Sequence, residues 1–385
     1  MKKGLLIVLI GLLFLPYCVK AETDLAPQAK SAILLEASTG KVIFEKNSHE
    51  KLHPASMTKM MSMLLILENI EKGVLTWDQM ITVSANASGM GGSQILLETG
   101  EQMSVDDLFK GIAVASGNDA VVALAEAIAG NVEGFVDMMN QRVEELGLKD
   151  THFKNPHGLD DADHYSSAYD MAMIGKELVK HEKVLEYSSI YEDYLRKGTD
   201  KEIWLVNTNK LVRFYPGVDG LKTGFTSEAG YCLTATAKKN NMRLIATVMG
   251  EETSATRNAE VSALLDYGYA QYKITELLDL TVPLAKVEIE KGKQRYVEIV
   301  PKTNATLLTK KTEQIGKISY DLNMDSIKAP LKSGDEVGTL SILQDGKEIN
   351  QVKVTIKEDL KKANFGELFY RYFTDITMGS MKFLR

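Results

Sequence analysis

The residues of this chain whose types and spacing suit chemistry are Ser56 and Lys59, at the start of the apolar run Met60 to Ile70. Apolar positions in that run recur at helical spacing, and Pro54 and Ala55 suit a helix start, so we predict a helix that begins at Ser56. Residues three apart share one face of a helix, which brings the hydroxyl and the amine within reach of each other. A buried amine can take the proton of a hydroxyl, and amides at a helix start can stabilise an oxyanion. Ser56 is therefore the candidate nucleophile.

The Ser-x-x-Lys pattern is short, and it occurs three times in the chain. Ser38 to Lys41 lies in a turn between two extended runs, and Ser48 to Lys51 lies in a polar loop. Only Ser56 opens a long apolar helix, which would pin its side chain against a core. By itself the pattern leaves a catalytic and a purely structural interpretation open.

Two further motifs could line the same cleft. Ser116-Gly117-Asn118 separates the helical stretches 105–115 and 121–128. Glycine permits a sharp turn there, and the flanking serine and asparagine can project into a cleft, although such a turn is also a common helix cap. Lys222-Thr223-Gly224 occurs once. On the edge of a strand it offers an ammonium, a hydroxyl and bare backbone to a peptide that carries a carboxylate.

The elements that must position these motifs alternate between strands and helices. A hairpin is expected from Ser31 to Phe44, and the other predicted elements are helices at 135–146, 171–179 and 259–272 and strands at 231–237 and 243–249. His157 lies in a loop between helices, and Asp170 follows a serine that can cap a helix. Both are candidate rim residues, although a lone histidine is more often a structural hydrogen-bond partner.

The N-terminus has the features of a secretory signal. Two lysines precede the apolar run Leu5 to Leu15, and Val19-Lys20-Ala21 is a small-residue cleavage pattern. We therefore predict a signal peptide at residues 1–21 and an exported protein outside the cytoplasm, because the apolar run is too short to span a membrane. Cys18 would leave with the signal. Cys232 would then be the single cysteine, so no intramolecular disulfide is expected.

Composition and the C-terminal part add to this picture. The 385 residues suffice for two or more domains, and a net charge of −7 without a basic stripe argues against nucleic acid as a partner. Alternating segments after residue 275 predict a small all-β domain at 275–358. Residues 359–385 return to helical spacing, with aromatic side chains on one face and basic residues around it. Such a helix can lie on the outer face of the cytoplasmic membrane or pack on the β domain, and its terminal position favours the membrane.

Together the three motifs resemble the set found in low-molecular-mass penicillin-binding proteins of the D-alanyl-D-alanine carboxypeptidase type. The stretches 155–159 and 165–168 resemble that family too, and the likeness covers nearly the whole mature chain. The resemblance implies an α/β (α+β) fold at residues 22–274, with a five-stranded antiparallel sheet flanked by helices. The β domain and an amphipathic C-terminal helix follow it. The second motif reads Ser-Gly-Asn rather than the Ser-Asp-Asn of class A β-lactamases, a variant that fits the carboxypeptidases.

The resemblance also implies roles for the motif residues. Ser56 would attack the carbonyl between two terminal D-alanines of a peptidoglycan stem peptide, with Lys59 as the base, and β-lactam antibiotics would acylate the same serine. The other implied roles are proton relay by Ser116 and Lys222, peptide and lysine orientation by Asn118, an oxyanion hole from the amides of Ser56 and Phe225 beside Gly224, and carboxylate binding by Thr223 and Arg257. No cofactor or metal is implied. Arg243 competes with Arg257, but it opens an apolar strand, which favours a structural role.

Two alternatives stay open at this point. A β-lactamase shares the motif set, but class A enzymes use a glutamate to hydrolyse the acyl-enzyme. Between Asn118 and Lys222 no glutamate stands four residues before an asparagine, as that class requires. A non-catalytic peptidoglycan-binding scaffold is the other alternative. It is disfavoured because Ser56, Lys59 and Lys222 are all present.

Overall fold

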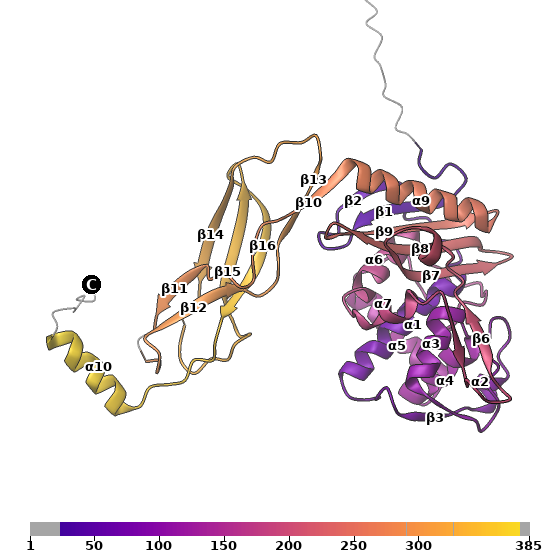
Figure 1. Cartoon of the computed structure of the whole chain (residues 1–385), viewed down its shortest axis with the longest axis horizontal. Helices are drawn as coiled ribbons and strands as arrows, with labels where there is room; N and C mark the ends of the chain where they lie inside the picture. Colours follow the sequence, from indigo (N-terminus) through magenta and orange to yellow (C-terminus); the bar gives the residue numbers. More distant parts are fainter. Residues whose placement is uncertain (1–23, 290, 326, 378–385) are drawn as a thin grey trace, which may run out of the picture.

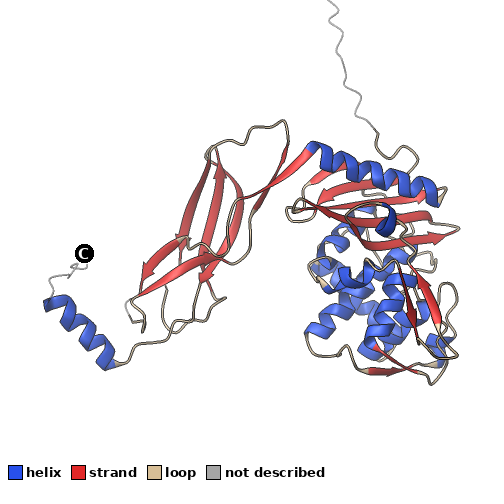
Figure 2. Ribbon diagram, viewed as in Figure 1, coloured by secondary structure: helices blue, strands red, loops and turns tan. Residues whose placement is uncertain are grey.

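The computed structural model of the chain describes residues 24–377 apart from 290 and 326. The predicted signal peptide lies outside these residues, as do the last eight positions of the predicted C-terminal helix. Figures 1 and 2 show a larger body of helices around a sheet, a separate β-rich part, and a helix at the far end of that part. The protein therefore has the α/β body, the all-β domain and the C-terminal helix that the sequence predicts.

A five-stranded antiparallel sheet forms the centre of the larger body, in the order β2-β1-β9-β8-β7. Its strands are β1 (Ser31–Glu36), β2 (Val42–Lys46), β7 (Val218–Thr226), β8 (Gly230–Lys239) and β9 (Met242–Glu251). The predicted hairpin is β1 and β2. Because β7 lies at the edge of the sheet, one side of its backbone is free to pair with an extended peptide.

Successive side chains of a strand point to opposite faces of the sheet, and here both faces are buried by helices. Leu34 and Leu244 pack in the core beneath α9 (Ser254–Gln271), which covers one face. Their neighbours Ile33 and Ile245 pack in the larger core on the other face, where the remaining helices gather. Figure 1 shows α9 on one side of the sheet and this helical layer on the other.

The helical layer contains the elements that carry the first two motifs. The turn that carries the candidate nucleophile Ser56, the nucleophile turn, is η1 (Ala55–Thr58), and it continues into the buried helix α1 (Lys59–Glu71). The other helices are α2 (Ala85–Ser88), α3 (Val105–Ala115), α4 (Asn118–Ala129), α5 (Val132–Glu145), α6 (Ala168–Leu178), α7 (Lys183–Ser188) and α8 (Leu211–Phe214). Two small hairpins accompany them, β3 (Met80–Thr82) with β4 (Gln102–Ser104), and β5 (Glu192–Leu195) with β6 (Ile203–Val206).

The start of the first helix differs from the prediction of an α-helix from Ser56. Ser56 lies in a 3-10 turn, in which the Met57 N–H donates to the Pro54 carbonyl over 3.1 Å, and the α-helix begins at Lys59. Ala55 has φ +47°, an uncommon value for a residue with a side chain. This backbone turn sets Ser56 at the surface of the core while Lys59 stays inside it.

The β-rich part begins directly after α9, where β10 (Tyr272–Glu276) pairs with β13 (Thr306–Lys310). Its main sheet has the order β11-β12-β16-β15-β14. Those strands are β11 (Ala285–Glu288), β12 (Tyr296–Pro301), β14 (Ile318–Met324), β15 (Glu336–Gln344) and β16 (Lys347–Ile356). The helix α10 (Phe365–Thr377) follows. Among the described residues, no helix has the length and apolar character to cross a membrane.

Candidate active site

Ser56 opens onto a cleft of about 460 Å³ between the helical layer and the edge strand β7. On the helical side the cleft is lined by Ser56, Ser93 and Ser116. The other side includes Thr223, Gly224 and Phe225 of β7 together with Arg257 of α9. All three sequence motifs therefore contribute to one cavity.

Lys59 is fully buried behind Ser56 and makes three short contacts. Its Nζ lies 3.0 Å from Ser56 Oγ, 2.6 Å from Asn118 Oδ1 and 2.7 Å from the His157 carbonyl oxygen. The two carbonyl-type oxygens can only accept, so they take two N–H bonds from the amine. In the neutral amine the nitrogen lone pair is then left to face the hydroxyl of Ser56. In that state Lys59 can accept the proton of Ser56.

The proton affinity of Lys59 suits that task. Burial lowers the pKa of Lys59 well below the ordinary value of a lysine, the nearby charge of Lys222 lowers it further, and Asp119 partly opposes the shift. Lys222 is also buried, and burial followed by the charge of Arg257 lowers the pKa of Lys222 to about 7. Two amines that are protonated in water therefore share this site with much weaker proton affinity.

Ser116 and Asn118 come from the break between α3 and α4. Ser116 has φ +65°, which turns the chain sharply, and its Oγ is buried without a hydrogen-bond partner among the described residues. A buried hydroxyl rarely remains unpaired, so Ser116 is placed to bond a ligand in the cleft. The Asn118 amide donates to the Gly91 carbonyl over 2.7 Å while its oxygen holds Lys59. Asn118 thus fixes the lysine from within the helical layer.

The backbone of β7 lies directly against the Ser56 turn. A Cβ atom at Gly224 would come within 2.6 Å of the Pro54 carbonyl oxygen, so the close approach requires glycine. The next residue, Phe225, lines the cleft beside Ser56. Thr223 Oγ1 donates to Thr208 Oγ1 over 2.7 Å, and Lys222 Nζ donates to the Thr223 carbonyl over 3.1 Å. The Lys-Thr-Gly strand therefore forms the wall of the cleft that adjoins the Ser56 turn.

Arg257 brings an uncompensated positive charge to the cleft. It lies in the first turn of α9 and is 4% exposed, and its guanidinium has the Asn258 side-chain oxygen as its one hydrogen-bond partner among the described residues, at 2.9 and 3.1 Å. No ion pair involves Arg257 in the described part of the chain. Arg243, by contrast, forms a bidentate pair with Asp219 at 2.7 and 2.8 Å, which is a structural role. A planar guanidinium such as that of Arg257 fits an incoming carboxylate.

Two predicted rim residues lie elsewhere. The ring of His157 is buried and does not line the cleft, and the residue reaches the site through its carbonyl oxygen on Lys59. Burial and the charge of Lys59 lower the pKa of His157 to about 3, so its ring is neutral at pH 7. Asp170 accepts bonds from the Asp150 N–H and the Thr151 hydroxyl at 2.8 and 2.7 Å, near the start of α6. The placement of Asp170 at the cleft rim is therefore not supported.

Sequence reasoning also missed several residues that line the cleft. Asn207, Thr208 and Lys210 follow β6 and enter the cleft from the side, and Ser93 enters it from the loop before β4. The polar run Asn207-Thr208-Asn209 after a strand is the one signal that marks this segment. It is too common in loops to indicate a site by itself.

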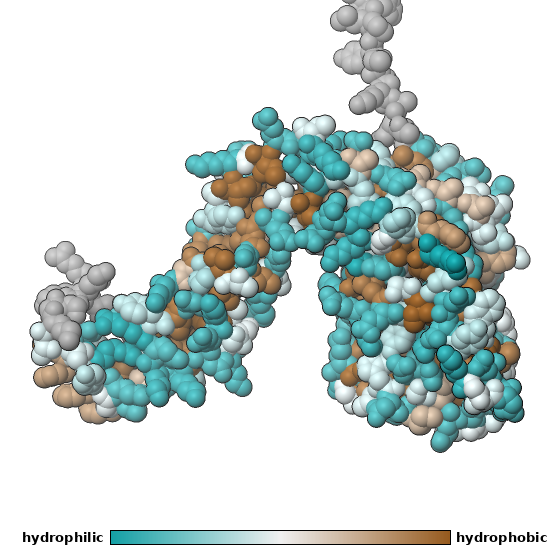
Figure 3. All heavy atoms as spheres, in the orientation of Figure 1, coloured by the Kyte–Doolittle hydropathy of each residue, from teal (hydrophilic) through white to brown (hydrophobic). Residues whose placement is uncertain are grey.

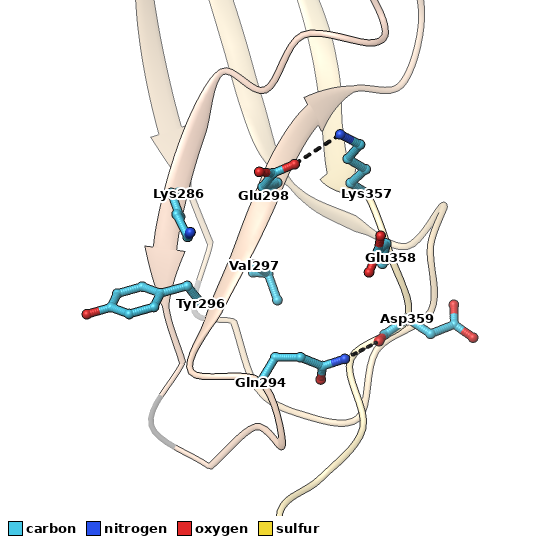
Figure 4. A pocket seen from close by; sticks show the side chains of 8 residues that line it. All are labelled: Lys286, Gln294, Tyr296, Val297, Glu298, Lys357, Glu358 and Asp359. Carbon is cyan, nitrogen blue, oxygen red and sulfur yellow. Dashed lines mark hydrogen bonds and ion pairs between the residues drawn. The ribbon is translucent and has the colours of Figure 1, made fainter. Parts of the chain in front are cut away.

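A smaller hollow of about 240 Å³ lies in the β-rich part, and charged side chains of both signs line it. Glu298 binds Lys357 at 3.0 Å, and Gln294 donates to the Asp359 carbonyl at 3.4 Å, as Figure 4 shows. It contains no serine, cysteine or histidine. Across the described residues no group of three or more His, Cys, Asp or Glu could hold a metal ion.

Comparison with known proteins agrees with this geometry. Residues 18–253 match the family model described as D-alanyl-D-alanine carboxypeptidase, and residues 275–362 match the C-terminal domain of penicillin-binding protein 5. The chain is 49% identical over 386 residues to the D-alanyl-D-alanine carboxypeptidase DacF of Bacillus subtilis, covering 98% of this chain and 99% of that protein. It is 36% identical over 345 residues to DacA of Escherichia coli, covering 88% and 85% respectively.

Solved structures give the same result. Penicillin-binding protein 5 of Haemophilus influenzae superposes with a TM-score of 0.69 at 33% identity, covering 87% of this chain and 98% of that one. Penicillin-binding protein D2 of Listeria monocytogenes, in its ampicillin-bound form, superposes with a TM-score of 0.57 at 30% identity, covering 63% and 98%. The chain belongs to the D-alanyl-D-alanine carboxypeptidase family of penicillin-binding serine peptidases.

Proposed function

We propose that Ser56 is the residue acylated when this carboxypeptidase removes the terminal D-alanine from a peptidoglycan stem peptide. The observation that carries the proposal is the set of contacts around Lys59, which leaves the lone pair of its neutral amine to face Ser56 Oγ at 3.0 Å. A serine so close to a buried base of lowered pKa is an activated nucleophile.

The reaction follows from this arrangement. Lys59 accepts the proton of Ser56 as Oγ bonds to the carbonyl carbon between the two D-alanines. The backbone amides of Ser56 and Phe225, two residues that line the cleft, would stabilise the oxyanion that forms. The C–N bond then breaks, and the departing D-alanine amine takes the proton by way of Ser116 and Lys222. Water attacks the acyl-enzyme in the second half and restores Ser56.

Substrate recognition is assigned to the charge of Arg257. Its buried guanidinium and the Thr223 hydroxyl would bind the terminal carboxylate, and that contact requires a free C-terminus on the peptide. Gly224 and Phe225 lie further along the same edge strand, so the peptide would extend beside β7. A β-lactam carries a carboxylate next to a strained amide and would acylate Ser56 in the same manner. The ampicillin-bound relative supports this assignment.

We further propose that the protein is exported and rests on the outer face of the membrane through α10. None of the side chains of α10 is buried, and Phe365, Phe369 and Phe373 stack in a row with 6.3 Å between ring centroids. The opposite side of the helix is tied to the β domain, since Asp375 pairs with Arg295 at 2.7 Å and Arg371 donates to the Gly292 carbonyl at 2.8 Å. Figure 3 shows the apolar side chains exposed at this end of the molecule.

This arrangement argues against packing of the aromatic face on the β domain. Polar contacts hold the helix, and its aromatic face is left open to the surroundings. An exposed apolar face on an amphipathic helix is the usual means of binding a lipid interface. The division of the chain at residues 21, 274 and 358 belongs to the same proposal. The family matches, which end at 253 and begin again at 275, are consistent with it.

The nucleophile is tested by locating the penicillin adduct by mass spectrometry. We expect one adduct, on Ser56, and none in Ser56→Ala. Ser38→Ala, which removes the serine of another Ser-x-x-Lys match, should label normally. Labelled Ser56→Ala protein would refute the assignment. Release of D-alanine from a pentapeptide, with slow turnover of a chromogenic cephalosporin, would separate the carboxypeptidase from a β-lactamase.

A further inference from the structure

His164 is a buried polar residue that touches the nucleophile turn but does not line the cleft. It is 1% exposed and lies in the loop that follows His157. Its Nε2 is 2.7 Å from Thr58 Oγ1, in the same turn as Ser56. Its Nδ1 accepts the Lys154 backbone N–H over 3.1 Å. Each ring nitrogen of His164 therefore has one protein partner.

These contacts determine which nitrogen of His164 carries the proton. The Lys154 N–H can only donate, so Nδ1 must be unprotonated, and the proton of the neutral ring is on Nε2. The ring therefore donates to Thr58 Oγ1. Burial, followed by the charge of His53, lowers the pKa of His164 to about 4, which agrees with a neutral ring at pH 7.

His164 holds the chain on both sides of Ser56. Its ring binds Thr58, which lies two residues after Ser56. Its carbonyl accepts a hydrogen bond from Nδ1–H of His53, which lies three residues before Ser56, over 3.0 Å. The loop that carries His164 also places the His157 carbonyl 2.7 Å from Lys59 Nζ. One loop thus fixes both the nucleophile turn and one of the two acceptors that orient the base.

We propose that His164 is a positioning residue for acylation, which sets Ser56 and Lys59 in register through its bond to Thr58. The inference rests on the proposed role of Ser56. Among the described residues, His164 does not line the cleft, and the hydrogen bonds of its side chain and carbonyl include neither Thr223 nor Arg257. Losing the bond to Thr58 should therefore slow acylation and leave the affinity for substrate nearly unchanged.

Substitution of His164 by asparagine or by glutamine tests its two ring hydrogen bonds one at a time. An asparagine places its amide near the position of Nδ1, so His164→Asn can keep the Lys154 bond while it loses the donor to Thr58. A glutamine reaches the position of Nε2, so His164→Gln can keep that donor. We expect His164→Asn to lower kcat for D-alanine release and the rate of penicillin acylation by about 10-fold, with KM within about 2-fold. His164→Gln should retain most of the rate.

The Thr58 side of the bond gives an independent test. Thr58→Val removes the acceptor hydroxyl without changing the volume and should lose as much acylation rate as His164→Asn, while Thr58→Ser should retain it. The double variant should be no slower than either single variant, because both remove one bond. His181→Asn, which alters a histidine paired with Glu71 far from the cleft, is the control.

Three outcomes would overturn the role of His164. They are equal losses in His164→Asn and His164→Gln, additive losses in the double variant, and a fall in thermal stability without a fall in kcat. Failure of the proposed nucleophile is a different result, since wild-type protein would then carry its penicillin adduct elsewhere than on Ser56. If His164→Asn does not fold, the comparison of Thr58→Val with Thr58→Ser decides the question.

Discussion

Lys59 and Lys222 are both buried next to the Ser56 cleft, and the positive charge of Lys222 lowers the pKa of Lys59. A base must be unprotonated to act, so acylation should fall as pH drops through the pKa of Lys59. The Lys222 charge disfavours a proton on Lys59, which is why the pKa of Lys59 lies lower than burial alone would place it. Lys222 itself has a pKa of about 7, so its charge is present mainly on the acid side of neutrality.

Removing the Lys222 charge should therefore change the pH profile in a defined direction. In Lys222→Met the pKa of Lys59 rises, so the acid limb of penicillin acylation moves to higher pH, in addition to any loss of maximal rate. The measurement is the acylation rate as a function of pH for both proteins.

Lys210→Met provides the control, because Lys210 also lines the cleft but is not among the charges that shift the pKa of Lys59. Its acid limb should stay in place. A limb in Lys222→Met that is unmoved, or moved to lower pH, would contradict the coupling between the two lysines.

The three motifs could be predicted from the sequence because each is a short pattern of particular side-chain types. Ser56, Lys59 and Asn118 are in direct contact, and the cleft brings Ser116, Thr223 and Arg257 to them. Their catalytic and binding roles remain predictions. His157 shows the limit of this reasoning, since it acts through a carbonyl that any residue at position 157 would supply. The sequence could not predict a role for His164 for another reason: its contact with Thr58 forms only when the loop folds against the nucleophile turn.

At the scale of elements, Gly158 brings the loop after α5 against the nucleophile turn. It has φ +90°, and a Cβ there would overlap the Ala55 carbonyl oxygen and lie 2.9 Å from Thr58 Oγ1. Gly158→Ala should therefore displace η1. The positive φ costs about 1 kcal/mol and the clash with backbone about 2 kcal/mol more. We expect a total loss near that sum in the free energy of unfolding, measured with urea, and much slower acylation.

A glycine elsewhere separates the two costs. Gly100 has φ +81°, and no atom lies within 4 Å of the position that a Cβ would take there. Gly100→Ala should therefore lose only about 1 kcal/mol and keep normal acylation. Equal behaviour of the two variants would show that the contact of Gly158 with the turn is unimportant.

The elements themselves were predictable where apolar periodicity is strong, as in the hairpin of β1 and β2 and in α3. The 3-10 turn at Ala55 was not, because nothing in an alanine favours φ +47°. That conformation is imposed by the close approach of Gly158 on one side and Gly224 on the other. Tertiary contacts therefore decide the geometry of the residue before the nucleophile.

At the scale of the whole molecule, the catalytic body and α10 lie at opposite ends of the β-rich part, as Figure 1 shows. The aromatic spacing of the last segment predicted the helix. It did not predict which side would be held by the β domain, because that depends on Arg295, which lies 80 residues before its partner Asp375. The pairing holds one side of α10 and leaves the phenylalanine row exposed.

If α10 binds lipid, its phenylalanine rings should supply most of the binding free energy. Each exposed ring that enters the apolar layer contributes about 1.5–3 kcal/mol, so Phe369→Ser combined with Phe373→Ser should weaken binding to vesicles by about 100-fold or more. The charges within α10 itself contact the β domain. Lys361 and Lys362 just before it are exposed and would be attracted to anionic lipid, so added salt should weaken binding in part. Sedimentation with vesicles of phosphatidylglycerol and phosphatidylcholine measures both effects.

Phe214→Ser, at an exposed phenylalanine of the catalytic body, should bind as the wild type does. Unchanged sedimentation of the double variant would remove α10 from the membrane proposal, while D-alanine release in solution should be the same for all three proteins.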